Sequence, residues 1–255
     1  MASWSPAQYL KFAKERTQPA IDLASKITVA DPRKVIDLGC GPGNSTRVLR
    51  ERWPDARIVG LDNSAEMIAQ ARRDFPEGEW LLADAATLDG QAEYDVVFSN
   101  AALQWIQNYE TLLPRLMRAV APGGCLAVQV PDDRESPLRK AVLSVAGSAK
   151  WATHTASADA RLCYRTAQEI YGLINALGRV DLWETTYYHV LASHQELIEW
   201  YKGSGMRPYL KALPDDFARA QFEEDVLRKC RRHYPMQSDG KVLYPFHRIF
   251  FVAYR

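Results

Sequence analysis

The chain has 255 residues, 47% of them hydrophobic, and a formal net charge of +1. This length allows one large α/β domain with an insertion or two small domains, and the near-zero charge gives no general attraction to polyanions. No apolar run approaches the roughly 20 residues that span a bilayer, and the first residues lack the basic-then-apolar pattern of a signal peptide. We therefore expect a soluble, cytoplasmic protein.

The first half of the chain alternates between strand-like and helical segments. Strands are predicted at 34–38, 56–62, 80–84, 94–100 and 125–130, and helices at 9–25, at 45–53, from Ser64 onward and at 112–120. Pro19 is expected to break or restart the first helix, and the sequence Ala-Pro-Gly-Gly at 121–124 is expected to stop the last one. The alternation predicts a parallel, doubly wound sheet with right-handed crossovers.

The second half is less regular. Helices are predicted at 137–150 and 166–177, strands at 180–190 and 246–254, and two or three helices within 195–234, interrupted at 203–205 and Pro214. The last strand is expected to complete a mostly parallel sheet of seven strands, in an α/β fold with a helical cap inserted before that strand. We expect an N-terminal helical segment over the site at 1–30, a cofactor-binding domain at 31–190 and 241–255, and a substrate cap at 191–240.

Residues that bind metals or form disulfides follow no recognisable spacing. Cys40, Cys125, Cys163 and Cys230 contain no Cys-x-x-Cys pair and are predicted to be reduced thiols. The five histidines show no metal-ligand spacing with cysteines or acids, so we predict no structural or catalytic metal. The basic run 228–233 follows three acids at helical spacing, which favours a solvated helix with internal ion pairs over a nucleic-acid site.

The most informative segment is 35–44, which reads VIDLGCGPGN. An apolar run ending in Asp37 and Leu38 predicts a buried strand, and the glycines that follow form a turn that a ligand can approach closely. A second strand ends in Asp62, about 20 residues further on, where an open α/β sheet places the acid that holds a ribose diol. The pattern predicts a nucleoside-containing cofactor at this end of the sheet.

Two cofactors fit such a turn, and two residues distinguish them. A dinucleotide-binding turn has its third glycine where this chain has Asn44, and Gly43 comes one residue early. Asp37 would repel a pyrophosphate but would pair with the ammonium of an amino acid. S-adenosylmethionine has that ammonium, a ribose and no phosphate, so Asp37 together with Asp62 favours it over NAD.

Five motifs occur in an order and spacing that resemble the class I S-adenosylmethionine-dependent methyltransferases. They are VIDLGCGPG (35–43), GLD (60–62), ADA (83–85), YDVVFSN (94–100) and APGG (121–124). The resemblance implies a Rossmann-like fold and a set of cofactor-binding residues: Asp37, Gly39, Gly41, Asn44, Asp62, Asn63, Met67, Asp84, Ala85 and Asn100. In the family pattern the glycines line the methionine portion, Asp62 holds the ribose and Asn100 faces the reactive centre. Asn63 and Met67 lie beside the adenine, and Asp84 and the Ala85 amide contact its edge.

Further motifs narrow the resemblance to one branch of that family, whose members esterify a tricarboxylic acid. They include ER (15–16), GNST (43–46), LQW (103–105), VQVPD (128–132), TTYYH (185–189), SHQ (193–195) and GMRP (205–208). The Asn/Asp-Pro-Pro-Tyr/Phe signature of amino methyltransferases is absent, since residues 99–102 read Ser-Asn-Ala-Ala. This absence counts against methylation of a nucleobase amine.

A carboxylate acceptor needs no general base, because an acid with a pKa near 4 is already ionised at neutral pH. Transfer is then an in-line displacement at a sulfonium, which a dry site and good alignment favour. Asn100 and Trp105 are expected to position the reactants, and arginines to hold the carboxylates that do not react. The predicted substrate-binding residues are Arg207, Arg16, Tyr9, Gln129, Tyr187, Tyr188, Tyr209 and Trp105. At most one of Tyr187 and Tyr188 is expected to face the site, because they lie on opposite faces of a strand.

Other functions remain open. Another small acid or a phenol would also suit a methyltransferase, and a phenol would need a base, for which His189 is the candidate. An NAD-dependent oxidoreductase is disfavoured by Asn44 and Asp37, and a non-catalytic S-adenosylmethionine-binding module would bind without turnover. We expect a small-molecule partner and neither nucleic acid nor a membrane, and the sequence leaves the oligomeric state open.

Overall fold

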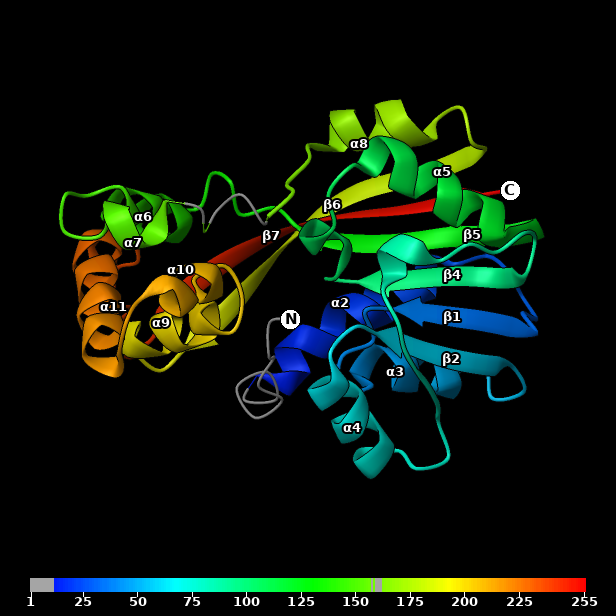
Figure 1. The fold of residues 1–255 in the computed structure, drawn as a ribbon, viewed down its shortest axis with the longest axis horizontal. Coiled ribbons are helices and arrows are strands. Elements are labelled where there is room, and N and C mark those ends of the chain that lie inside the picture. Colours follow the sequence, from blue (N-terminus) through cyan, green and yellow to red (C-terminus); the bar gives the residue numbers. More distant parts are fainter. Residues whose placement is uncertain (1–11, 157, 159–161) are drawn as a thin grey trace. The chain divides into compact units, whose positions relative to one another are not determined.

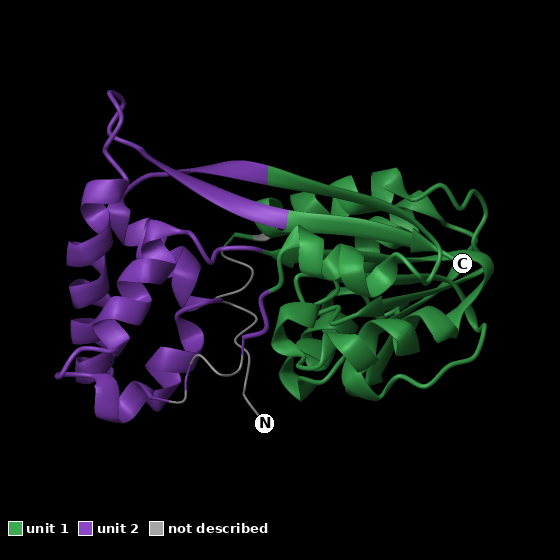
Figure 2. Ribbon diagram, turned by 90° about the horizontal axis from the view of Figure 1, so that it is seen from above, with its two compact units in different colours: residues 1–131, 165–185, 249–255 green, residues 132–164, 186–248 purple. Residues whose placement is uncertain are grey.

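The computed structural model describes residues 12–156, 158 and 162–255. The chain forms two compact units, coloured separately in Figure 2. Unit 1 contains residues 1–131, 165–185 and 249–255, and unit 2 contains residues 132–164 and 186–248. Tyr9, predicted to bind substrate, lies outside the described residues together with the rest of 1–11.

Seven strands form one sheet in the order β3-β2-β1-β4-β5-β7-β6 (Figure 1). The strands are β1 (Lys34–Leu38), β2 (Arg57–Asp62), β3 (Glu79–Leu82), β4 (Tyr94–Asn100), β5 (Val120–Pro131), β6 (Arg179–Leu191) and β7 (Val242–Tyr254). The first five strands pair in parallel. β7 runs against β5, because Arg255 N donates to Gly124 O at one end and Asp132 N donates to His247 O at the other, each at 3.0 Å. The predicted α/β fold with a seven-stranded, mostly parallel sheet is confirmed.

Helices lie on both faces of the sheet in unit 1 (Figure 2). They are α2 (Ala13–Lys26), α3 (Asn44–Arg52), α4 (Ala65–Asp74), α5 (Tyr109–Ala119) and α8 (Ala167–Ile174). The central strands are apolar almost without a break, as two-sided burial requires, and Val35, Ile36 and Leu38 of β1 have no exposed surface. Since β2 and β4 flank β1, the strand order reverses there, and a crevice at a reversal is where open α/β sheets bind ligands.

Pro19 does not interrupt the first helix, contrary to the expectation. α2 continues through Pro19 from Ala13 to Lys26. A proline inside a helix removes one main-chain hydrogen bond and costs about 3 kcal/mol in isolation. Here Pro19 is buried beside the buried Ala20 and Leu23, and α2 packs on α3, so tertiary packing offsets that cost.

The strand after α5 begins earlier than predicted. β5 starts at Val120 and therefore includes the segment 121–124, which was expected only to stop the helix before it. Gly123 adopts a φ of 81°, and its N–H donates to Arg255 O at 3.0 Å. Pairing with the last residue of the chain thus extends the strand through a motif that reads locally as a turn.

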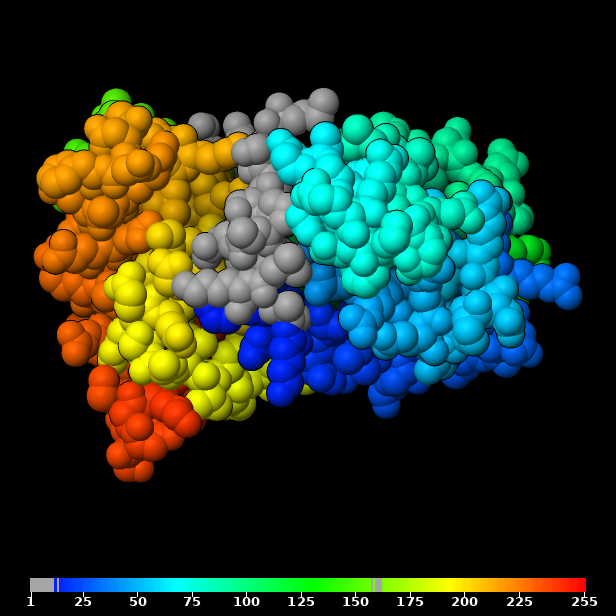
Figure 3. Space-filling view, turned by 90° about the horizontal axis from the view of Figure 1, so that it is seen from below, coloured from blue at the N-terminus to red at the C-terminus, as the bar shows by residue number. Residues whose placement is uncertain are grey.

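Unit 2 is mainly helical. It contains α6 (Pro137–Ala146), α7 (Ala152–Thr155), α9 (His194–Lys202), α10 (Arg207–Ala212) and α11 (Asp216–Cys230). Three helices, α9 to α11, cover most of the segment 195–234, where two or three were expected, with breaks at the predicted glycines and at Pro214. The segment 191–240, expected to form the cap alone, shares this unit with residues 132–164, because α6 packs on α11. The turn between the bridged residues Met236 and Val242 projects from unit 2 (Figure 3).

Phe222 joins the parts of unit 2 that are distant in sequence. Its ring lies edge-on to Trp151 at 5.6 Å and stacks with Tyr209 at 6.3 Å between centroids. Phe222→Ala is expected to lower the free energy of unfolding by about 3–5 kcal/mol, because it leaves a cavity in a fully buried position. Urea unfolding measures the loss, and Phe217→Ala on the same helix is the control, since Phe217 is 72% exposed. Equal losses in the two variants would contradict this assignment.

Three further expectations concern the cysteines, the basic run 228–233 and membrane-spanning segments. The four cysteines are buried and form no disulfide. In the basic run, Arg228 pairs with Asp225 one turn earlier on α11, as expected of a solvated helix. No helix in the described part of the chain has the length and apolar character needed to cross a membrane.

Candidate functional site

The glycine-rich turn connects β1 to α3 at the carboxyl edge of the sheet. Gly39, Gly41 and Gly43 have φ values of 71°, 56° and 98°, which L side chains rarely adopt. A Cβ on Gly39 would overlap the side chain of Ala102, which follows β4. The turns after β1 and β4 therefore approach each other where the strand order reverses, and only a glycine allows that approach.

Asp37 is fully buried at the base of this turn. Its Oδ2 accepts hydrogen bonds from Ser45 Oγ at 2.7 Å and Thr46 Oγ1 at 2.6 Å, both in the first turn of α3. Its Oδ1 is buried without a hydrogen-bond partner among the described residues. Burial raises the pKa of Asp37 to about 6, while the two hydroxyls act in the opposite direction. A buried carboxylate oxygen of this kind suits a cationic ligand group.

Asp62 closes the other side of the turn. Its Oδ2 accepts from Gly41 N at 2.9 Å, and its Oδ1 accepts from Ser64 N at 2.8 Å. Burial raises the pKa of Asp62, partly countered by these backbone bonds. Each oxygen keeps a second lone pair. The carboxylate thus fixes the glycine turn and the start of α4 and can still accept hydroxyl donors.

The ends of the neighbouring strands supply the remaining predicted cofactor residues. Asn63 is exposed, and Met67 is buried with its N–H on Ser64 Oγ at 3.3 Å. After β3, the exposed Asp84 caps a short 3-10 turn by accepting from Ala86 N at 2.9 Å, and Ala85 is buried. This capping bond leaves the second carboxylate oxygen of Asp84 available.

Asn100 and Asn44 are placed differently. Asn100 ends β4 opposite Gln129 of β5, and its buried Oδ1 has no partner within the described ranges. Asn44 instead begins α3 and donates from Nδ2 to Thr17 Oγ1 at 3.3 Å, which ties α3 to α2. Asn100 is therefore poised to accept a donor from a ligand, whereas the side chain of Asn44 is used between two helices.

The predicted substrate residues are divided between the two units. In unit 1, Arg16 is half-buried on α2, Gln129 is fully buried in β5, and Trp105 lies half-buried in the 3-10 turn Leu103–Trp105. In unit 2, Arg207 is the first residue of α10, and its N–H donates to Ser204 O at 3.1 Å. Pro208 follows it without ending the helix, because proline is compatible with the first turn of a helix.

The tyrosines predicted beside the substrate have different surroundings. Tyr188 is 65% exposed, and Tyr187 lies on the opposite face of β6 together with the buried His189. Tyr209 is 2% exposed and stacked on Phe222, so its ring packs in the core of unit 2. His189 also packs, with its ring 4.2 Å from that of Trp200. That burial disfavours His189 as the base that a phenol would need.

Sequence reasoning missed two buried arginines in unit 2. Arg248 is 4% exposed, and its guanidinium lies 4.6 Å from the ring of Phe246. Arg139 is 7% exposed and lies 4.5 Å from the ring of Tyr164. Arginine is rarely buried unless it is paired. The sequence did contain a signal for a buried Arg248, because this charged residue interrupts the aromatic run 246–251. It contained no such signal for Arg139, which lies on the amphipathic helix α6.

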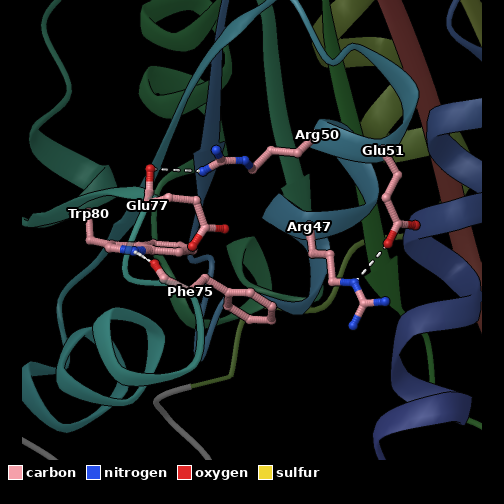
Figure 4. Close-up of a pocket in the computed structure, with 6 residues that line it drawn as sticks. All are labelled: Arg47, Arg50, Glu51, Phe75, Glu77 and Trp80. Carbon is pink, nitrogen blue, oxygen red and sulfur yellow. Dashed lines mark hydrogen bonds and ion pairs between the residues drawn. The ribbon is translucent and has the colours of Figure 1, made fainter.

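Metal ligands and pockets add little to this site. No group of three or more His, Cys, Asp or Glu side chains suited to a metal occurs within residues 12–156, 158 and 162–255. A pocket of about 260 Å³ in unit 1 is lined by Arg47, Arg50, Glu51, Phe75, Glu77 and Trp80 (Figure 4). It contains none of the predicted site residues, and it lies beside α3.

Comparisons with known proteins agree with the fold and the turn. A methyltransferase-domain model matches residues 35–124. The YcgJ protein of Bacillus subtilis has the same fold, with a TM-score of 0.61 at 13% identity over 93% of this chain and 99% of that one. A geranyl diphosphate methyltransferase solved with SAM gives a TM-score of 0.57 at 14% identity over 97% of this chain and 88% of that one. The fold is that of the class I methyltransferases, and the methyltransferase-domain model agrees with it.

Two relatives place the chain more narrowly. It is 48% identical to the trans-aconitate 2-methyltransferase of Methylobacterium nodulans over 100% of this chain and 99% of that protein. It is 41% identical to the trans-aconitate 2-methyltransferase of Variovorax paradoxus over 99% of this chain and 98% of that protein. The chain belongs to the trans-aconitate 2-methyltransferase family.

Proposed function

We propose that this protein transfers a methyl group from S-adenosylmethionine to a carboxylate of trans-aconitate and releases the monomethyl ester and S-adenosylhomocysteine. Weaker activity is expected on cis-aconitate and citrate. The observation that carries the proposal is the full-length identity of 48% to a relative of that name, which includes unit 2 as well as the cofactor half. The arrangement of Asp37 and Asp62 around the glycine turn supports the choice of cofactor.

The residues at the strand ends fit the chemical groups of this cofactor. Oδ1 of Asp37 is a buried acceptor that would hold the ammonium, and Asp62 would accept from the ribose hydroxyls. The Ala85 N–H and the free oxygen of Asp84 would recognise the adenine edge, and Met67 would pack on its face. When bound, the cofactor supplies an electrophilic methyl group on a sulfonium.

The protein contributes orientation and charge neutralisation rather than a proton transfer. The attacking carboxylate is ionised at neutral pH, so no general base is required. Arg207 and Arg16 would hold the carboxylates that do not react, since a guanidinium on the attacking oxygen would lower its nucleophilicity. Asn100 and Trp105 would align the reactants and exclude water, which raises the effective concentration of the two groups.

The proposal is tested with methyl-labelled S-adenosylmethionine and a panel of di- and tricarboxylic acids. Base-labile label on trans-aconitate, with less on cis-aconitate or citrate, is the expected result. Transfer to a different acid or to a phenol would retain the enzyme class and replace the substrate. Cofactor binding without transfer to any acceptor would indicate a non-catalytic module.

Binding of S-adenosylhomocysteine is expected to weaken below pH 6. Because the pKa of Asp37 is raised to about 6, its carboxyl is protonated in the ligand-free protein at lower pH, whereas an ammonium partner requires the ionised form. Each pH unit below 6 should then raise the Kd about tenfold. Calorimetry between pH 5 and 7.5 measures this dependence.

Asp37→Asn is the control for that experiment, since it keeps the shape of the side chain without its titration. The variant should bind S-adenosylhomocysteine more weakly than the wild type at pH 7, and its Kd should change little with pH. Asp62, whose pKa is also raised, remains titratable in the variant. A wild-type Kd that does not change with pH would contradict the ammonium role of Asp37.

The raised pKa of Asp37 also affects the stability of the ligand-free protein. Asp37 stabilises the fold below pH 3.8, its ordinary pKa, and this stabilisation is lost as the pH rises through about 6.

A further inference from the structure

Trp80 lies behind the glycine-rich turn, in a space that three glycines leave open. An added Cβ would stand 2.7 Å from the indole Cη2 at Gly43, 2.5 Å from Cζ3 at Gly60 and 2.5 Å from Cε2 at Gly78. Cβ atoms essentially never approach a side chain within 3.0 Å. The indole therefore fits only because three positions lack side chains: the end of the cofactor turn, the middle of β2 and the residue before β3.

The orientation of the indole is fixed by its own element and by its neighbours. Trp80 pairs with Gly60 in the register of β2 and β3. Its Nε1 donates to Phe75 O at 3.0 Å (Figure 4), and its ring lies 6.4 Å from that of Phe75. Phe75 approaches Gly43 as well, with its Cδ2 3.0 Å from the position of an added Cβ. Both aromatic rings thus lie close to Gly43, the residue that precedes α3.

One side of the indole lies against the glycine turn, and another side borders a pocket. The pocket of about 260 Å³ is lined by Trp80 and Phe75 together with residues of α3, including Arg47 and Arg50 (Figure 4). Trp80 is half-buried rather than enclosed in a core. A ring that only filled a core would be surrounded on all sides. This ring instead lies between the pocket and two glycines, Gly43 of the cofactor turn and Gly60 of β2.

We propose that Trp80 is a positioning residue that sets the conformation of the glycine turn and thereby the affinity for S-adenosylmethionine. The inference rests on the proposed cofactor site. Trp80 acts through two glycines: Gly43, the N-cap residue that precedes α3, and Gly60, which lies opposite Asp37 in the sheet register and two residues before Asp62. Trp80 itself does not touch the cofactor in this proposal.

The first test is the Kd of S-adenosylhomocysteine in Trp80→Ala. A tenfold or larger increase is expected, with a matching rise in the KM for S-adenosylmethionine and an unchanged KM for trans-aconitate. Trp80→Phe should recover part of the affinity, because it keeps a ring against the glycines. Trp183→Ala is the matched control, since Trp183 is also half-buried and stacked, on Phe250 at 5.1 Å, but lies on β6 at the opposite edge of the sheet.

The second test is a double-mutant cycle with Gly60→Ala. That Cβ would meet Trp80 at 2.5 Å and Cys40 Sγ of the glycine turn at 3.0 Å, so the single variant should also weaken binding at least tenfold. In the Trp80→Ala background the indole is gone, and the same change should weaken binding by less than about twofold further. Additive losses across the cycle would show that the two residues do not act together.

The outcomes separate this inference from the proposed function. Failure of the wild type to bind S-adenosylhomocysteine would overturn the cofactor site itself. Wild-type binding together with equal Kd values in Trp80→Ala and Trp183→Ala would overturn only the role of Trp80. If Trp80→Ala does not fold, Trp80→Phe and the single Gly60→Ala variant still decide the matter, because each is expected to change the Kd without removing the strand.

Discussion

Asp62→Ala is expected to raise the KM for S-adenosylmethionine about 100-fold while leaving the KM for trans-aconitate unchanged. Hydrogen bonds to a charged group contribute roughly 1.5–3 kcal/mol each. The Asp62→Ala variant would lack those that the carboxylate accepts from the ribose hydroxyls. It would also lose the bonds to Gly41 N and Ser64 N that fix the turn and the start of α4. Initial rates at varied cofactor concentration, together with calorimetry of S-adenosylhomocysteine, measure the effect.

Asp62→Asn and Asp74→Ala are informative controls for this prediction. The asparagine keeps one oxygen acceptor and should show an intermediate KM. Asp74 is exposed at the end of α4, and its replacement should leave the KM unchanged. An Asp62→Ala enzyme that folds and keeps the wild-type KM would rule out Asp62 as the ribose-binding acid.

Arg207→Ala is expected to raise the KM for trans-aconitate about 100-fold with little change in cofactor affinity. Guanidinium–carboxylate pairs are frequently bidentate, and removal of the guanidinium leaves a substrate carboxylate without its partner. Arg207 is half-buried at the first position of α10, so its side chain begins from backbone held in the first turn of a helix. Substrate saturation curves at fixed, saturating S-adenosylmethionine measure the change.

Lys211→Ala on the same helix is the matched control, since it removes a positive charge one turn later. Arg207→Lys should recover only part of the affinity, because an ammonium cannot bind a carboxylate in the bidentate manner. Wild-type affinity for trans-aconitate in Arg207→Ala, in a protein that still binds cofactor, would remove Arg207 from the substrate site. Arg139 and Arg248, both buried in unit 2, would then be the next arginines to replace.

The cofactor half was predictable because its signals are local. The strand bounds predicted at 34–38 and 94–100 match β1 and β4, since short apolar runs bounded by turn residues leave few alternatives. The glycines 39, 41 and 43 predicted a turn for the same reason, and each has a positive φ. By contrast, whether Pro19 breaks the first helix depends on the packing of α2 against the rest of the unit. The sequence of the helix alone does not contain that information.

Unit 2 was less predictable because its contacts join distant parts of the chain. Nothing near Trp151 indicates that it meets Phe222 and donates from Nε1 to Asp225 at 3.0 Å. Trp80 gives the same lesson in unit 1, since its relation to Gly43 depends on how β3 pairs with β2. Local patterns predict which element forms, and the register between elements decides which side chains meet.

The division of the chain into units has a consequence for how this enzyme can diversify. Each unit is assembled from separate stretches, with boundaries after residues 131, 164, 185 and 248. No single crossover between two related genes can therefore exchange one unit intact. A recombinant would carry parts of both units from each parent. The boundaries after residues 185 and 248 also lie within strands β6 and β7. Changes confined to unit 2 are thus expected to arise by point substitution rather than by transfer of a ready-made module.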